Sequence, residues 1–149
     1  MGTRFRTIDD VLDFAIARET ESRRFYADLA PLATSPEVRK IIHRLARDEL
    51  QHGIHLQAIK AGKAAFAGEE EVRSLDIEEV LAEVSPQPGM SYADLLVVAM
   101  KKEKAAFRLY TNLASLAKSE ALRGMLTKLA QEEAEHKLRL ELEYDWATF

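Results

Sequence analysis

Apolar residues recur at intervals of three and four along four stretches of this chain, and polar residues fill most of the positions between them. This spacing is typical of helices that bury one face and expose the other. The four stretches cover about residues 7–30, 35–60, 91–116 and 119–143. The pattern therefore predicts four amphipathic helices and an all-α fold.

Each predicted helix begins at a residue whose hydroxyl can accept a hydrogen bond from the backbone: Thr7, Ser35, Ser91 and Ser119. Asp10 and Asp94 follow the first and third of these by three residues, which completes a capping box at each helix start. Pro36 occupies a first helical position, where its missing N–H leaves no bond unmade. We expect the last helix to fray somewhere beyond Glu143.

The four inward stripes are mainly apolar, but each is interrupted by an acid, and two are also interrupted by a histidine. Their members are Ile8, Leu12, Ala15, Glu19, Ser22, Tyr26 and Leu29; Val38, Ile41, Leu45, Glu49, His52, Leu56 and Ile59; Tyr92, Leu95, Ala99, Glu103, Ala106, Tyr110 and Leu113; and Leu122, Met125, Leu129, Glu133, His136 and Leu140. Glu19, for example, stands where a leucine would be expected. His43 and His55 fall outside these stripes, and we expect both on the surface.

The chain contains two copies of one helical hairpin, because a shift of 84 residues aligns its halves. Matched residues include Tyr26 with Tyr110, Leu29 with Leu113, Ser35 with Ser119, and Leu45-Ala46 with Leu129-Ala130. Short connections within each half make its helices antiparallel neighbours. Glycines and prolines break the pattern over residues 61–90, where only residues 76–84 look like a short helix. We therefore predict a single domain, residues 1–149, in which a long crossover joins two hairpins.

Composition excludes several kinds of site and partner. The chain has no Cys, which rules out disulfides, iron–sulfur clusters and metal sites with Cys ligands. The net charge is -4 and both signs are mixed along every segment, so we expect no nucleic acid partner. No apolar stretch reaches the roughly 18 residues of a membrane span. We expect no membrane partner and a cytoplasmic location.

Two short motifs lie 84 residues apart, Glu49-Leu50-Gln51-His52 and Glu133-Ala134-Glu135-His136. On a helix, a Glu and a His three residues apart are separated by about 60° around the axis, so both project from one face and can bind the same metal ion. A single Glu precedes each motif by 30 residues. The candidate metal-binding and catalytic residues are therefore Glu19, Glu49, His52, Glu103, Glu133 and His136.

Electrostatics explains why such a set would gather inside a bundle. A buried Glu without a partner is costly, and four at one level also repel one another. Two divalent ions would balance the charge of the four Glu side chains, and two neutral His side chains would complete the coordination. Any one of these Glu residues alone would more simply lie on a solvated face, and one inward His alone would be an ordinary core residue. The matched spacing of all six favours a pair of metal ions.

Four further residues are predicted to support these ligands. Tyr26 and Tyr110 each follow a Glu by seven residues, about two turns along the same face, so each hydroxyl can reach a carboxylate of a facing helix. Core packing is the alternative for both tyrosines. Asp48 and Glu132 directly precede the Glu of each motif. We expect each of them to hydrogen-bond the His of the other half and so to orient its ring towards a metal.

With these residues in place, the chain resembles the rubrerythrin-type branch of the ferritin-like di-iron proteins over about residues 7–143. The resemblance rests on Glu19 with Tyr26, Glu103 with Tyr110, and the two Glu-x-x-His motifs. It implies a ferritin-like four-helix bundle holding two iron ions that cycle between ferrous and ferric states and react with peroxide or dioxygen. It also implies that Glu49 and Glu133 bridge the two ions and that the other two Glu residues are terminal ligands.

The chain departs from the pattern of that family in two places, and from that of the bacterioferritins in a third. Rubrerythrins usually carry an extra Glu one turn after the third-helix ligand, where this chain has Ala106; together with Ser22, this small residue predicts a channel for a small oxidant. Rubrerythrins often end in a Cys-ligated rubredoxin-like domain, so a chain without Cys needs an external electron donor such as a rubredoxin-like protein. The Met that binds haem in bacterioferritins is Leu50 here, which argues against haem.

Three hypotheses for the function follow. The first is a di-iron redox enzyme that acts as a peroxide reductase or a ferroxidase. The second is a subunit of a ferritin-like iron-storage cage, and the third is a non-redox bundle that binds zinc or manganese. Phe14, Phe25 and Leu32 are predicted to leave apolar surface on the first hairpin, which would suit a homodimer.

Overall fold

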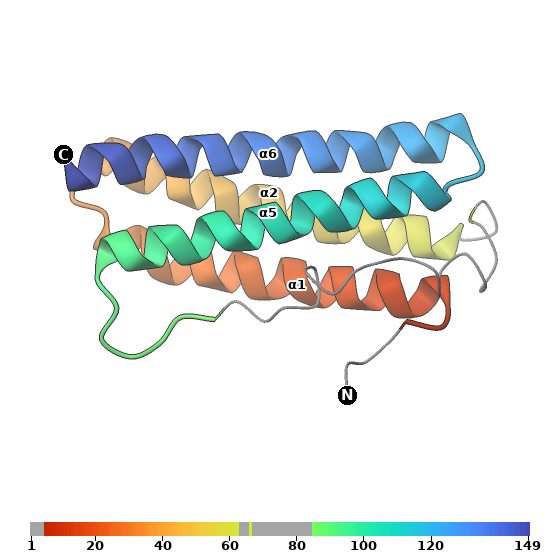
Figure 1. Cartoon of the computed structure of the whole chain (residues 1–149), viewed down its shortest axis with the longest axis horizontal. Helices are drawn as coiled ribbons and strands as arrows, with labels where there is room; N and C mark the ends of the chain where they lie inside the picture. The colour runs from red at the N-terminus through yellow and green to blue at the C-terminus, as the bar shows by residue number, and fades with distance from the viewer. Residues whose placement is uncertain (1–4, 63–65, 67–84) are drawn as a thin grey trace.

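The computed structural model describes residues 5–62, 66 and 85–149 (Figure 1). Four α-helices and one short 3-10 helix occupy these residues: α1 (Ile8–Leu29), η1 (Ala30–Leu32), α2 (Pro36–Ala61), α5 (Tyr92–Leu116) and α6 (Glu120–Thr148). The short helix predicted over residues 76–84 lies outside the described residues. A bilayer-crossing segment is not found among the described helices, since none combines the necessary length and apolar character.

The predicted caps are present at the start of each of the four described α-helices. The hydroxyls of Thr7 and Ser91 each accept a hydrogen bond of 3.1 Å from the backbone N–H three residues further on. The carboxylates of Asp10 and Asp94 accept a bond in return from the backbone N–H of the capping residue. The same hydroxyl cap closes the starts of α2 and α6. These bonds satisfy donors that a helix leaves unpaired at its N-terminus.

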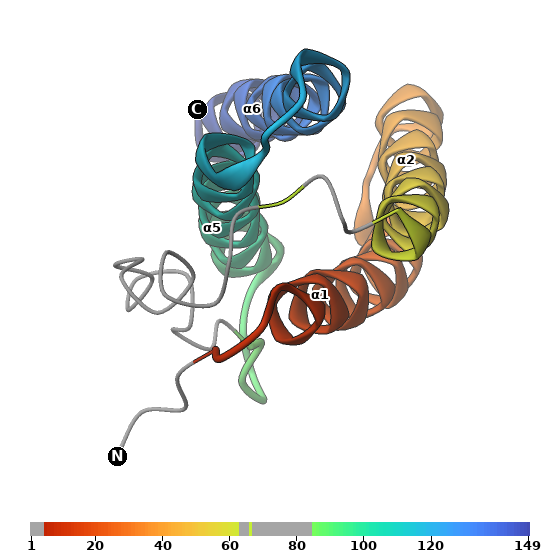
Figure 2. The same ribbon diagram turned by 90° about the vertical axis from the view of Figure 1, so that its right-hand side faces the viewer.

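The helices form two antiparallel hairpins. α1 and α2 pack along their length, as do α5 and α6 (Figure 1). Figure 2 shows the four helices end-on, arranged around one common axis. α2 ends and α5 begins at opposite ends of the bundle, as the predicted crossover requires. The prediction of an all-α four-helix bundle made of two hairpins is confirmed.

Two clusters of buried apolar side chains fill the interior, one towards each end of the bundle. Leu12 and Leu113 belong to the cluster near the start of α1, and Leu29 and Leu140 belong to the cluster near the turn between α1 and α2. On each α-helix, one or more buried charged or ionisable residues separate the members of the two clusters. The bundle therefore consists of two dry apolar layers with a polar layer between them.

One predicted inward position on α6 is wrong. Met125 is 45% exposed, and Leu126 is fully buried in its place. From Leu122, a step of four residues keeps the side chain over the core better than a step of three, because a helical turn takes 3.6 residues. α6 also remains helical as far as Thr148, since Glu143 accepts a hydrogen bond of 3.1 Å from the Tyr92 hydroxyl and stays attached to α5.

The predicted outer surface of the first hairpin is smaller than expected. Phe25 is buried, with its ring centroid 5.6 Å from that of Tyr26 and 5.5 Å from Lys102 Nζ, because α5 covers this side of α1. Phe14 is only partly exposed, whereas Leu32 is exposed as predicted. His43 and His55, outside this surface, are both exposed, as predicted.

Candidate metal centre

The polar layer contains all six residues predicted as metal ligands. α1 contributes Glu19, α2 contributes Glu49 and His52, α5 contributes Glu103, and α6 contributes Glu133 and His136. None of these residues is more than 4% exposed. Each lies on a helix whose apolar residues pack in the layers above and below, so the packing of the helices fixes the direction of each side chain.

The atoms that these side chains offer to a metal form two overlapping groups. One group comprises Glu19, Glu49, His52 and Glu133, and the other comprises Glu49, Glu103, Glu133 and His136. Within each group, one ligand atom per residue lies within 4.8 Å of the others. Glu49 and Glu133 belong to both groups. Two neighbouring ions could be held by this arrangement, in which two carboxylates are available to both ions and one Glu and one His to each.

Each histidine is oriented by an acid from the other hairpin. His52 Nε2 lies 2.6 Å from Glu132 Oε2, and His136 Nε2 lies 3.0 Å from Asp48 Oδ2, which are the pairings expected from the sequence. The Nδ1 atoms point inward, where they lie 3.1 Å and 3.3 Å from the same oxygen, Glu133 Oε1. The outer hydrogen bonds thus leave Nδ1 of each ring facing the carboxylates, available to a metal.

Two tyrosines hold the carboxylates that belong to only one group. The Tyr26 hydroxyl donates a hydrogen bond to Glu103, and the Tyr110 hydroxyl donates one to Glu19, as predicted. Burial, followed by the negative charge of the bonded Glu, raises the pKa of both hydroxyls well above their usual value. Both tyrosines therefore remain protonated donors at neutral pH.

Crowding of acids in a dry layer changes their proton affinity. Burial raises the pKa of Glu49 and Glu133 well above the usual carboxyl range, and the negative charge of Glu103 raises it further. Burial lowers the pKa of His52, but the nearby carboxylates of Glu19, Glu49 and Glu132 together outweigh this effect and the pKa rises to about 9. Without a cation, the layer thus binds protons that the same groups would release in water near neutral pH.

Seven buried side-chain atoms of this layer have no hydrogen-bond partner: Glu19 Oε2, Glu49 Oε1, His52 Nδ1, Glu103 Oε2, Glu133 Oε1 and Oε2, and His136 Nδ1. Each of the six residues contributes at least one of them. A buried polar atom left unpaired costs about 1–3 kcal/mol, and such atoms are rare in folded proteins. Carboxylate oxygens and imidazole nitrogens suit iron, manganese or zinc. The residues present therefore fit a pair of divalent ions.

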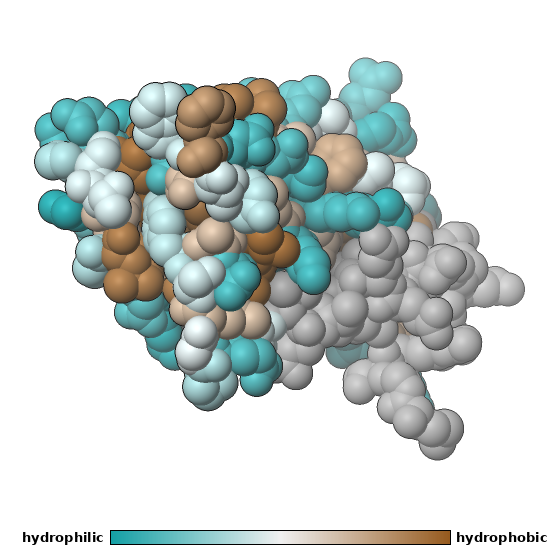
Figure 3. Space-filling view, turned by 60° about the vertical axis from the view of Figure 1, so that its left-hand side comes forward, coloured by the Kyte–Doolittle hydropathy of each residue, from teal (hydrophilic) through white to brown (hydrophobic). Residues whose placement is uncertain are grey.

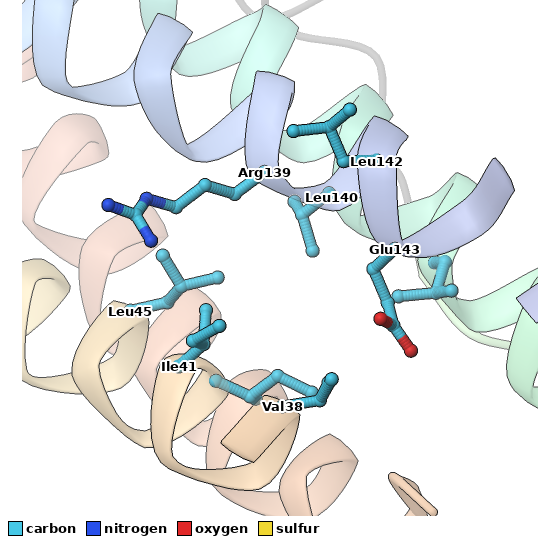
Figure 4. A pocket seen from close by; sticks show the side chains of 9 residues that line it. Val38, Ile41, Leu45, Arg139, Leu140, Leu142 and Glu143 are labelled. Carbon is cyan, nitrogen blue, oxygen red and sulfur yellow. The ribbon is translucent and has the colours of Figure 1, made fainter. Parts of the chain in front are cut away.

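Two cavities lie along the seam between α2 and α6. One is a cleft of about 230 Å³ with a mainly aliphatic lining, in which Val38, Ile41 and Leu45 face α6, and Arg139 extends from α6 (Figure 4). The other, of about 160 Å³, has a polar lining and reaches His136. Among the six candidate ligands, only this histidine lines either cavity.

A third cavity, of about 190 Å³, opens between α1 and α2 and is lined by two of the candidate ligands, Glu19 and Glu49. Ser22 and Ala106, where the sequence predicted a channel, are not part of its lining, and Ala106 packs against an apolar cluster instead. Gly53 does line this cavity. A glycine inside a helical pattern is the sequence signal that could have indicated it.

Lys102 is a buried charge next to the centre that the sequence pattern did not reveal. Its side chain is 5% exposed, and its Nζ atom lies 2.8 Å from Glu21 Oε1. The pair joins α5 to α1 directly beside Glu103. A lysine next to an inward position normally lies on a solvated flank, so the spacing of residues alone gives no sign of its burial.

The fold and the six buried residues together define a ferritin-like four-helix bundle with a centre lined by carboxylates and histidines. The Rubrerythrin family model matches residues 10–88 and 94–145, and the chain belongs to the rubrerythrin family. A solved structure from Thermotoga maritima, described as a ferritin-like diiron-carboxylate protein, is similar with a TM-score of 0.74 at 22% identity, covering 97% of this chain and 98% of that one. A comparison with curated proteins finds no match.

Proposed function

We propose that this protein is a di-iron redox protein that reacts with peroxide or dioxygen. The observation that carries the proposal is the group of seven unpartnered, buried ligand atoms in two overlapping sets. Two divalent ions would balance the charge of the four Glu side chains, and membership of the rubrerythrin family favours iron among the metals that these donors suit. The similar protein from Thermotoga maritima, described as a diiron-carboxylate protein, also supports this choice.

The six residues would bind the two ions in two different ways. Glu49 and Glu133 would help to hold both ions, because each belongs to both groups. The remaining Glu and His residues would each bind one ion. Bound iron would supply electrons to the oxidant by passing between its ferrous and ferric states.

The residues around the ligands would keep them in position. Tyr26 and Tyr110 hold one oxygen of each terminal Glu, so that its other oxygen points inward. Asp48 and Glu132 hold the outer nitrogen of each histidine ring and fix the direction of the inner one. The apolar layers on both sides exclude bulk water, which strengthens electrostatic interactions within the centre.

An external electron donor is part of this proposal. Turnover with peroxide requires the centre to be reduced again, and the chain has no Cys with which to hold a redox cluster of its own. A rubredoxin-like protein has the right chemistry for this role. A ferroxidase would differ, because ferrous iron itself would then be the electron source.

Spectroscopy of the iron-loaded protein tests the proposed function. Protein loaded with Fe(II) without oxygen and mixed with peroxide or air should develop the near-ultraviolet absorption of oxidised iron bound to carboxylates. Iron-loaded protein that reacts with neither oxidant would contradict the proposal. Metal analysis of protein purified without added iron decides between this function and a zinc or manganese bundle.

Homodimer formation remains a prediction. The exposed apolar surface that would suit it lies on α6, and not on the first hairpin as expected. Leu138, Leu142 and Trp146 recur every four residues on the outer face of α6 and are 57%, 61% and 80% exposed. Figure 3 shows apolar patches among polar ones on the face towards this end of the bundle. Measurement of the mass in solution distinguishes a dimer of about twice the chain's 16.8 kDa from a ferritin-like storage cage.

A further inference from the structure

Gly53 stands in the interior of α2, one residue after His52. Glycine is among the least favourable residues for a helix interior, so its presence there calls for a local reason. The cavity between α1 and α2 provides one. Gly53 lines this cavity together with Glu19 and Glu49, and a Cβ atom at position 53 would lie 3.9 Å from the Cβ of Glu19. A side chain longer than alanine would therefore extend over the Glu19 carboxylate.

The cavity reaches the part of the centre that lacks hydrogen bonds. Glu19 Oε2 and Glu49 Oε1 are both buried and without a partner, and both residues line the cavity. The polar cavity between α2 and α6 reaches one of the six candidate ligands, His136, whose Nδ1 atom also has no partner. Of these two cavities, the one beside Gly53 is lined by two of the four carboxylates of the centre, and the other by none of the four.

The remaining lining indicates what kind of molecule the cavity admits. Ile16, Leu50 and Ile54 form apolar walls, and the exposed residues Thr20, Arg23 and Gln57 are the polar part of the lining. Arg23 is the only charged residue there besides the two carboxylates. Apolar walls with a few polar groups at the exposed edge suit a small molecule without charge. A volume of about 190 Å³ is several times the roughly 30 Å³ that one water occupies in the liquid, which is ample for hydrogen peroxide or dioxygen.

We propose that this cavity, which we call the Gly53 port, is the entrance through which a small neutral oxidant reaches the centre. Gly53 keeps the port open because it has no side chain. The inference rests on the proposed function and adds to it the route and the class of the oxidant. It also assigns Gly53 a role in oxidant access. This role depends on the missing side chain and requires no direct contact with a metal.

Three variants isolate the effect of the port. Gly53→Leu fills it, Gly53→Ala adds only a methyl group at ordinary contact distance, and Gly124→Leu is the matched control. Gly124 is also inside a helix, α6, but a Cβ atom there would have no atom within 4 Å. Both leucine substitutions raise helix propensity by the same amount, so any difference between them comes from the surroundings.

The first measurement needs no reaction at the centre. Dissolved dioxygen is small, neutral and paramagnetic, and it speeds the relaxation of methyl protons that it approaches. In protein prepared without added metal, dioxygen should relax the Ile16 methyl groups at least about threefold less in Gly53→Leu than in Gly124→Leu. The methyl groups of Ile59, which belongs to the apolar cluster and does not line the port, should not change. Equal relaxation of Ile16 in the two variants would overturn the proposal.

The second measurement follows oxidation of the Fe(II)-loaded protein by hydrogen peroxide in a stopped-flow instrument. Gly53→Leu should react at least about tenfold more slowly than Gly124→Leu while binding the same amount of Co(II), and Gly53→Ala should fall between them. Equal oxidation rates in Gly53→Leu and Gly124→Leu, with equal metal binding, would overturn the proposal that the oxidant enters through the Gly53 port. If the wild-type protein itself does not react with peroxide, the proposed function fails, and the relaxation experiment alone decides whether the port admits small neutral molecules.

Discussion

Tyr26 of α1 and Glu103 of α5 are joined by a buried hydrogen bond that crosses from one hairpin to the other. The internal repeat places the same contact between Tyr110 and Glu19 on the opposite side of the centre. Each hairpin thus supplies the residue that orients a ligand of its partner hairpin. The metal centre and the docking of the two hairpins therefore depend on the same contacts.

Replacement of Tyr26 by Phe should weaken metal binding by about 10- to 100-fold, because Glu103 loses the donor that orients it. It should also lower the free energy of unfolding of the metal-free protein by about 1–3 kcal/mol, since a buried oxygen is left unpaired. Competition with a chelator and urea denaturation measure the two effects. Tyr92→Phe is the control, because that hydroxyl bonds Glu143 outside the centre. Metal affinity unchanged in Tyr26→Phe would show that the tyrosine is only a packing residue.

The two acids that hydrogen-bond the outer histidine nitrogens, Asp48 and Glu132, should affect metal affinity even though both are partly exposed. Asp48→Asn and Glu132→Gln each remove a charged partner from one histidine, and we expect a loss of metal affinity of about 10- to 100-fold in each. Glu135→Gln provides the control, since this exposed acid lies within the same motif and the acids that hydrogen-bond the two rings are Glu132 and Asp48. Isothermal titration with Co(II) measures all three. An equal loss in Glu135→Gln would mean that general charge, and not ring orientation, causes the effect.

Stability of the metal-free protein should fall as the pH rises. His52 has a pKa of about 9 in the folded protein against 6.5 for the free side chain, so its stabilising contribution is fully present below 6.5 and is lost as the pH passes 9. Glu49 and Glu133 also bind protons more tightly when folded, and they destabilise the protein increasingly as the pH rises above the unfolded carboxyl value of 4.5. All three shifts therefore act in the same direction.

Calorimetry in the presence of a chelator measures this dependence. The unfolding temperature should decrease steadily from about pH 5 to about pH 9, and His52 alone should account for a loss on the order of 3 kcal/mol. Metal-loaded protein should show the opposite trend over the lower part of this range, because metals displace protons from their ligands. An unfolding temperature that rises with pH in the metal-free protein would be incompatible with protonated carboxyls in the polar layer.

The residues of the centre could be predicted from the sequence because two periodicities coincide there. Spacing of three and four residues placed Glu49 and His52 on one helix face, and the repeat of 84 residues required a matching face around Glu133. The hairpins and their caps followed from local signals of the same kind. The predictions failed where partners distant in the sequence decide burial.

Lys102 is buried because it contacts Glu21 and the Phe25 ring on α1. Both residues are far from position 102 in the sequence, so the local pattern around Lys102 does not reveal these contacts. The same contact explains the buried Phe25. The exchange of Met125 for Leu126 has another cause, since a step of four residues from Leu122 keeps a side chain over the core better than a step of three. Cavities are set by the same packing, so the Gly53 port could not be predicted from the spacing of residues.

Anaerobic titration with Fe(II) tests the central claim most directly, because the two overlapping groups make different demands on each ligand. The wild-type protein should bind about two ions per chain, Glu19→Gln should retain about one, and Glu133→Gln should lose both, since Glu133, unlike Glu19, belongs to both groups. A wild-type protein that saturates well below two ions per chain, or a Glu133→Gln variant that still binds two, would contradict a paired metal centre.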